Sequence, residues 1–118
     1  MSEKEAPSLG DWLREARIGR GASLRSVASA MEITPSYLSD IENNHRTPAE
    51  EVLRRLTAYL ELDFEQGMAL AGRFGDQTHQ YLRRQPAAVK LLRQVSAADL
   101  SAQDLEEISR LIAQKFEK

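Results

Sequence analysis

Apolar side chains return every three or four positions along most of the chain, which is the spacing that gives an α-helix one apolar face. The clearest stripes lie within residues 9–16, 24–31, 38–41, 52–60, 64–71, 89–95 and 105–116. Valine and isoleucine are few and do not alternate with polar residues for long, so strands are not expected. The pattern therefore predicts an all-α protein.

Small polar residues and prolines mark the expected helix starts. Pro35 and Pro48 suit the first position of the helices expected at 34–43 and 48–60, because an N–H at that position would have no partner. The expected N-caps, whose side chains accept a hydrogen bond from the first turn, are Ser8, Ser23, Thr34, Asp63 and Ser101.

A boundary is expected at residues 72–76, GRFGD, which contain two glycines and follow five expected helices. We expect a first domain over residues 8–71 and a C-terminal helical segment over residues 76–118. A segment of roughly 40 residues usually needs oligomerisation to bury enough apolar surface. The side chains expected in the core of the first domain include Trp12, Leu13, Leu53 and Phe64, and Phe74, just beyond its end, is a further candidate.

Composition limits the function classes. The chain has no cysteine, which excludes disulfides and thiolate metal sites and fits a reducing compartment. No apolar run approaches the roughly 20 residues that span a bilayer, and the opening MSEKEAPS is too polar and acidic for a signal peptide. We expect a soluble cytoplasmic protein with no membrane contact.

Charge and motifs argue against catalysis. His45 and His79 are the only histidines, they lie far apart, and no acidic residues repeat around them at metal-ligand spacing. No Ser-His-Asp set and no glycine-rich phosphate loop is visible. We therefore expect no metal, no cofactor and no enzyme activity.

The net charge is −2, and residues 1–62 hold 8 Lys/Arg against 10 Asp/Glu. Domains that bind nucleic acid usually have a basic surface. Binding to DNA would therefore have to depend on where single charges are placed.

Residues 23–48 contain the most informative pattern. Two short helices, 24–31 and 34–43, are joined by a tight turn, which describes a helix-turn-helix. Ala28 lets the two helices approach closely, and Leu38 and Ile41 bury one side of the second. The polar side then presents Pro35, Ser36, Ser39, Asp40 and Asn43.

Over residues 9–70 the chain resembles the helix-turn-helix domain of phage-repressor-like (Cro/C1, or XRE) transcriptional regulators. The resemblance is carried by SLRSVA at 23–28, ITPSYLSDIE at 33–42 and RTP at 46–48. It implies a five-helix lambda-repressor-like DNA-binding domain whose helix at 34–43 enters the major groove of double-stranded DNA.

The resemblance also implies roles for individual residues. Glu42 is expected to form a structural ion pair with Arg17. The implied base-edge positions are Pro35, Ser36, Ser39 and Asp40, and the implied contacts to the DNA backbone come from Ser23, Arg25, Asn43, Asn44, His45 and Arg46. Thr34 and Tyr37 complete the expected DNA-binding set; the Tyr37 hydroxyl either binds a phosphate or packs on the domain surface.

Two positions depart from the family pattern. Asn44 stands where a glycine is usual, although asparagine tolerates the left-handed conformation. The base-edge positions lack the Gln, Asn or Arg that bind bases in a bidentate way. We expect modest sequence discrimination by each monomer.

The C-terminal segment has an apolar stripe that must be covered. Its members are Leu105, Ile108, Leu111, Ile112 and Phe116. The helix either folds back on the first domain or packs against its copy in a homodimer, which would read two half-sites of an inverted repeat.

The leading hypothesis is a dimeric repressor. The first alternative is an antitoxin or adaptor whose C-terminal helices bind another protein, with DNA binding for autoregulation. A protease acting on the C-terminal segment and a ligand-sensing pocket there are further alternatives.

Overall fold

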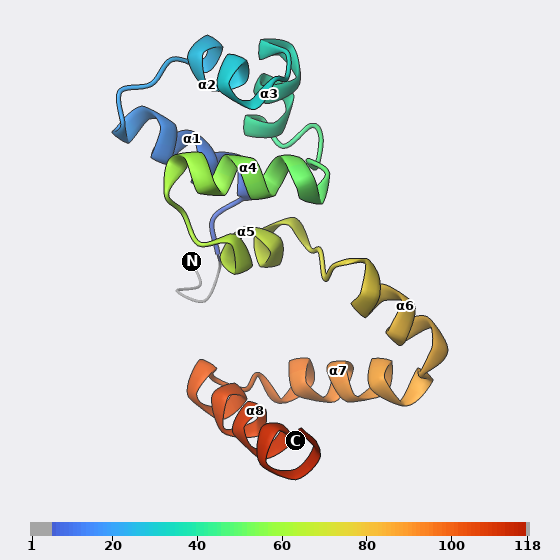
Figure 1. Ribbon diagram of the computed structural model, residues 1–118. Coiled ribbons are helices and arrows are strands. Elements are labelled where there is room, and N and C mark those ends of the chain that lie inside the picture. Colours follow the sequence, from blue (N-terminus) through green and yellow to red (C-terminus); the bar gives the residue numbers. More distant parts are fainter. Residues whose placement is uncertain (1–5, 118) are drawn as a thin grey trace. The chain divides into compact units, whose positions relative to one another are not determined.

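The structure is a computed structural model of the 118-residue chain, and residues 6–117 are described here. These residues form helices and no strand, so the all-α prediction is confirmed (Figure 1). Residues 1–5, on which the expectation of no signal peptide partly depends, lie outside the described residues. The helices are α1 (Leu9–Gly19), α2 (Leu24–Met31), α3 (Pro35–Glu42), α4 (Glu50–Leu60), α5 (Phe64–Ala71), α6 (Asp76–Arg84), α7 (Pro86–Ala98) and α8 (Ala102–Phe116).

The chain divides into two compact units, the first ending at Gly75 and the second beginning at Asp76. The first unit contains α1 to α5. In it α3 packs against both α1 and α2, while α5 packs against α4 and α1 (Figure 1). The second unit contains α6 to α8, and each unit is described by itself below.

The expected N-caps at Ser8, Ser23, Thr34, Asp63 and Ser101 are confirmed. Each side chain accepts a hydrogen bond from the backbone N–H three residues later. This bond satisfies a donor that the helix itself cannot pair, and such a cap typically stabilises a helix by about 1 kcal/mol. Local sequence therefore fixes most helix starts.

The start expected at Pro48 is wrong by two residues. α4 begins at Glu50, and Ala49 is its N-cap without a side-chain hydrogen bond. Pro48 lies buried in the preceding loop, where its carbonyl accepts a hydrogen bond from Arg73 Nε at 2.9 Å. The first carbonyl bonded within the helix is that of Ala49, which accepts from the Leu53 N–H at 3.0 Å.

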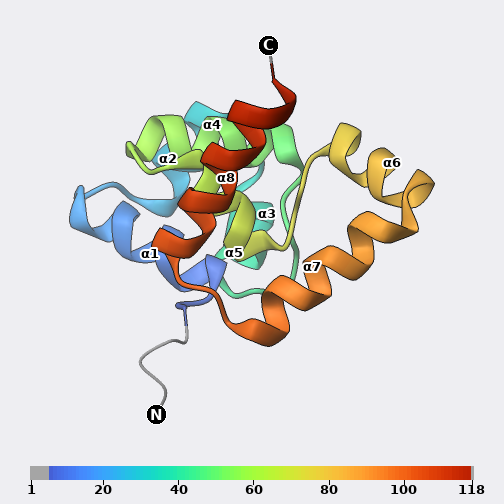
Figure 2. The same ribbon diagram turned by 90° about the horizontal axis from the view of Figure 1, so that it is seen from below.

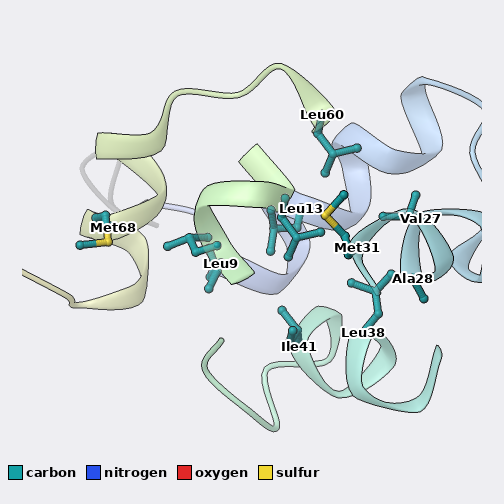
Figure 3. Close-up of a cluster of buried hydrophobic side chains, with 11 residues drawn as sticks. Leu9, Leu13, Val27, Ala28, Met31, Leu38, Ile41, Leu60 and Met68 are labelled. Carbon is teal, nitrogen blue, oxygen red and sulfur yellow. The ribbon is translucent and has the colours of Figure 1, made fainter. Parts of the chain in front are cut away.

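The core of the first unit is aliphatic, and its side chains converge from all five helices (Figure 3). Burying a large aliphatic side chain stabilises a fold by roughly 1.5–3 kcal/mol before entropy is counted. Trp12 and Phe64 are half-buried against this core, and Phe74, expected inside, is 53 % exposed. Phe74 follows the left-handed Gly72 that ends α5, so it is outside the helical stripe. The buried set is Leu9, Leu13, Val27, Ala28, Met31, Leu38, Ile41, Leu53, Leu56, Leu60 and Met68.

The second unit differs because none of its described helices has a buried residue. α6 and α7 pack together and meet at a corner next to Pro86, and α8 follows the left-handed Asp99 (Figure 2). Ser101 and Asp104 form a reciprocal capping box at the start of α8. The side chains predicted for dimerisation, Leu105, Ile108, Leu111, Ile112 and Phe116, are all exposed.

Candidate nucleic-acid interface

A tight turn joins α2 to α3. Glu32 takes a left-handed conformation with φ 59°, and the Ile33 N–H donates to the Ala28 carbonyl at 3.0 Å. Ala28 is fully buried, so a larger side chain there would push the two helices apart. The small residue and the left-handed turn together set the close crossing of a helix-turn-helix.

The outward side of α3 is polar and accessible. Ser36 is exposed, Ser39 and Asp40 are half-buried, and Leu38 and Ile41 on the other side are fully buried. Thr34 binds the N–H of Tyr37 through Oγ1 at 3.0 Å. α3 is therefore held from behind by the core and capped at its start, with its hydroxyl and carboxylate groups facing away from the core.

A buried ion pair ties α3 to α1. Glu42 is only 3 % exposed, and its carboxylate accepts two hydrogen bonds from Arg17, at 2.7 Å from Nε and 2.9 Å from Nη2. The hydrogen bonds to Glu42 raise the pKa of Arg17, while burial of the guanidinium acts in the opposite direction. Arg14 adds a second guanidinium at 3.5 Å from the same carboxylate. The negative charge of Glu42 is therefore offset within the protein.

The loop after α3 folds back on the helix end. The N–H groups of His45 and Arg46 both donate to the Asp40 carbonyl, at 2.8 and 3.3 Å. Asn43 donates from Nδ2 to Ser39 Oγ at 3.3 Å and accepts a hydrogen bond from Arg14. These contacts hold the loop close to the polar side of α3.

Asn44 takes the left-handed conformation expected of it, with φ 62°. Its side-chain amide bridges to the start of α1: Oδ1 accepts from the Gly10 N–H at 2.9 Å, and Nδ2 donates to Ser8 Oγ at 3.0 Å. Since Ser8 also caps α1, the loop after α3 is fastened to the first turn of α1.

Two side chains of the loop face residues of α3. His45 Nδ1 lies 4.0 Å from the Asp40 carboxylate. The Arg46 guanidinium carbon lies 4.8 Å from the centre of the Tyr37 ring, which is a cation–π contact. The polar side of α3 therefore has a cationic group beside it, although α3 itself contains no basic residue.

Comparison with known proteins agrees with this geometry. The family model described as "Helix-turn-helix" matches residues 13–66. The transcriptional regulator ClgR of Mycobacterium tuberculosis is 32 % identical over 79 residues, which are 67 % of this chain and 70 % of that protein.

The chain belongs to the phage-repressor-like helix-turn-helix family of transcriptional regulators.

Two further relatives have related sequences. The regulator DdrOP3 of Deinococcus deserti is 35 % identical over 70 residues, covering 59 % of this chain and 54 % of that protein. The crystal structure of the clp gene regulator ClgR from C. glutamicum is 30 % identical, covers 54 % of this chain and 83 % of that chain, and has a TM-score of 0.48.

The sequence analysis did not assign Ser8 or Gly10 to the site, and Arg14 was considered but not included in it. A Cβ on Gly10 would lie 2.3 Å from the Glu42 carbonyl oxygen, so α1 and α3 approach at this point more closely than any other residue allows. The signal was a glycine inside the apolar stripe of a helix, which often marks a close backbone approach. Arg14 lies one turn before Arg17 and so faces the same partner.

Ser23 and Arg25 lie at the start of α2. Ser23 Oγ accepts from the Ser26 N–H at 3.0 Å, so its hydroxyl caps the helix, and Arg25 is exposed. Among residues 6–117, no cluster of His, Cys, Asp or Glu has metal-binding geometry. Nor is any helix within that range long and apolar enough to cross a membrane.

Proposed function

We propose that the chain is a sequence-specific DNA-binding regulator, a repressor that inserts the polar side of α3 into the major groove. The observation that supports this most is the combination of an accessible Ser36, Ser39 and Asp40 with a helix held rigidly from behind by the core and by the Arg17–Glu42 pair. A helix of this size fits the major groove with its first turns near the base edges.

The chemistry of α3 predicts which bases it can favour. Asp40 can accept a hydrogen bond from cytosine N4, and the hydroxyls of Ser36 and Ser39 suit several bases. Pro35, half-buried at the first helical position, can contact a thymine methyl. None of these is a bidentate contact, so one copy should discriminate weakly among sequences.

Affinity for the DNA backbone would come from groups around α3. The first N–H groups of α2, next to Ser23 and Arg25, have no partner within the helix and favour an anion. Thr34, Asn43, Asn44, His45 and Arg46 border the polar side of α3, and the last of these is cationic. Because Glu42 is neutralised by Arg17 and Arg14, it would not repel the phosphates.

Because one copy should discriminate weakly among DNA sequences, two copies bound side by side would recognise an operator more specifically. We propose that two chains form a homodimer through the apolar stripe of α8 and bind an inverted-repeat operator. Leu105, Ile108, Leu111, Ile112 and Phe116 are exposed in the single chain, and no described helix of the second unit buries a residue. Two linked recognition helices combine their affinities on half-sites about 34–36 Å apart.

The DNA interface is tested with the triple variant Ser36→Ala/Ser39→Ala/Asp40→Ala on a duplex selected by the wild-type chain. We expect its affinity for that duplex to fall to the level of unrelated DNA, while binding to unrelated DNA persists because the cationic groups remain. The matched control is Glu65→Ala/Gln66→Ala on the exposed side of α5, which also removes one carboxylate. Unchanged binding of the triple variant to the selected duplex would contradict the proposal.

The dimer is tested with Ile108→Asp in the centre of the stripe. We expect sedimentation equilibrium to show a dimer for the wild type and a monomer for the variant, because a buried carboxylate is costly. Gln114→Asp adds the same charge elsewhere on α8 and should stay dimeric. A monomeric wild type, or a dimeric Ile108→Asp, would rule out this interface.

The exposed stripe also favours a second candidate, in which α8 binds a different protein, as an antitoxin or adaptor does, or presents a site for a protease. This candidate predicts a wild-type monomer that co-purifies with a stoichiometric second protein from its native host. A repressor dimer predicts instead that a reporter gene behind the selected operator is silenced by the wild type and not by Ile108→Asp.

A further inference from the structure

The contact between Tyr37 and Arg46 joins the recognition helix to the loop that follows it. Tyr37 lies on α3 and is half-buried against the core, so its ring is held in place by packing. Arg46 is exposed and lies beyond the end of the helix, with its guanidinium carbon 4.8 Å from the centre of that ring. A fixed surface on α3 therefore supports a flexible side chain from the loop.

The backbone beneath Arg46 is fixed independently. Its N–H donates to the Asp40 carbonyl at 3.3 Å, and the preceding His45 N–H donates to the same oxygen at 2.8 Å. Asn44 is bonded to Gly10 and Ser8 on α1. With the backbone held from two sides, the long side chain of Arg46 is the part whose placement the Tyr37 ring decides.

This placement matters because α3 contains no basic residue and the whole chain has a net charge of −2. A cation strengthens a phosphate contact next to the recognition helix, and Arg46 is the arginine of the loop that follows it. Stacking uses the face of the guanidinium and leaves its N–H edge available to donate to phosphate oxygens. An arginine already ordered before binding loses less conformational entropy when it binds.

We propose that Tyr37 is a positioning residue whose ring, and not its hydroxyl, holds the Arg46 guanidinium ready to bind a DNA phosphate. This inference rests on the proposed DNA-binding function and deepens it. It also decides between the two roles left open for Tyr37: the ring packs on the domain surface, and the phosphate contact belongs to Arg46.

The test compares Tyr37→Phe, Tyr37→Leu, Arg46→Gln and the double variant Tyr37→Leu/Arg46→Gln in the full chain, on the duplex selected by the wild type. Tyr37→Phe keeps the ring and should bind like the wild type. Tyr37→Leu keeps apolar volume but loses the stack, and we expect affinity to fall about two- to five-fold for each recognition helix bound.

The double variant separates positioning from direct contact. Once Arg46 is replaced by Gln, Tyr37→Leu should cost little more, because the guanidinium that the ring positions is gone. Arg46→Gln should also lower the slope of log affinity against log salt by about 0.9 for each chain bound, as expected when one phosphate contact is lost. Tyr37→Phe should leave that slope unchanged.

Thermal unfolding of every variant shows whether a loss of affinity comes from a loss of fold. If Tyr37→Leu proves unstable, Arg46→Lys supplies the same test from the other side, because it keeps the charge and loses the planar stack. The Arg46→Lys variant should lose as much affinity for the selected duplex as we expect for Tyr37→Leu.

The inference is overturned if Tyr37→Phe binds as weakly as Tyr37→Leu, which would make the hydroxyl the contact, or if the losses in the double variant simply add. Unimpaired binding by Arg46→Lys would also overturn it. These outcomes differ from a failure of the proposed function, in which the wild-type chain selects no duplex and its affinity does not depend on salt.

Discussion

Both units of the chain consist of helices with an apolar stripe, but the stripes are buried in the first unit and exposed in the second. In the first unit, apolar stripes on α1 to α5 meet each other and bury Leu13, Leu38, Ile41, Leu53 and Leu56 almost completely. In the second, α8 has a stripe of similar strength that stays exposed, with Leu111 62 % and Phe116 69 % accessible. The same periodic pattern thus gives a core in the first unit, whereas in the second unit it leaves a stripe on α8 that the helices of that unit do not cover.

Polar groups differ between the units as well. The first unit contains a buried ion pair and a side-chain bridge, Arg17–Glu42 and Asn44 to α1, that fix α3. In the second unit, Ser101 and Asp104 form the reciprocal capping box at the start of α8. The Arg17–Glu42 pair and the Asn44 bridge thus join different parts of the fold, whereas the capping box lies within one helix end.

Leucine truncation should produce the largest difference between the units. Leu53→Ala should destabilise the first unit by about 2–5 kcal/mol, because it leaves a cavity in a fully buried site. Leu111→Ala, the matched truncation on α8, should leave the unfolding of the first unit almost unchanged and weaken self-association instead. Urea unfolding of the first unit and sedimentation measure the two effects, and the reverse outcome would contradict the comparison.

Removal of the buried carboxylate should have the next largest effect. Glu42→Ala should cost about 2–4 kcal/mol, because it leaves Arg17, whose side chain is 14 % exposed, without its partner. Since the pKa of Arg17 is raised in the fold, the contribution of its charge to stability is fully present below the ordinary arginine pKa and is lost as pH rises through the raised pKa.

The control for this prediction is Glu61→Ala. Glu61 is 76 % exposed and lies 3.5 Å from Arg20. The loss of a surface pair of this kind should change the free energy of unfolding by less than about 1 kcal/mol. Chemical denaturation that showed equal effects at Glu42 and Glu61 would contradict a special role for the α1–α3 pair.

Adding a methyl group to α1 should destabilise the fold at Gly10, which faces α3, and stabilise it at Gly19, which faces no other group. Both effects should be smaller than that of removing Glu42. Gly10→Ala should cost about 1–3 kcal/mol, because the new Cβ would meet the Glu42 carbonyl. Gly19→Ala, where a Cβ meets nothing within 4 Å, should stabilise the helix end by up to about 1 kcal/mol. Thermal unfolding distinguishes the two signs, and equal signs would show that the close approach at Gly10 is unimportant.

Much of the first unit could be predicted from its sequence because local chemistry determines it. The N-caps, the left-handed Asn44 and the buried side of α3 follow from residue type and helical spacing. The start of α4 at Glu50 differs from the prediction at Pro48, and its N-cap Ala49 has no side-chain hydrogen bond that would mark it in the sequence. The bridge from Asn44 to Ser8 and the stack of Arg46 on Tyr37 depend on contacts between distant segments.

In the second unit, the sequence predicts the helices but not what covers their apolar surface. Its helices α6 to α8 could be predicted from periodicity and from Pro86 and Ser101. A stripe such as that of α8 shows that apolar surface needs a partner, but the pattern along one chain contains no information about which partner covers it. The occupant of that surface must therefore be measured.

The most direct test of the central claim is selection of duplexes from random DNA by the 118-residue chain, followed by mass measurement of the complex. We predict an inverted repeat whose half-site centres lie about one helical turn apart, or a multiple of it, bound by two chains. The central claim is that α8 joins two chains so that their two α3 helices bind two half-sites of DNA. Selection of no sequence, or a single chain bound to an unsymmetrical site, would contradict it.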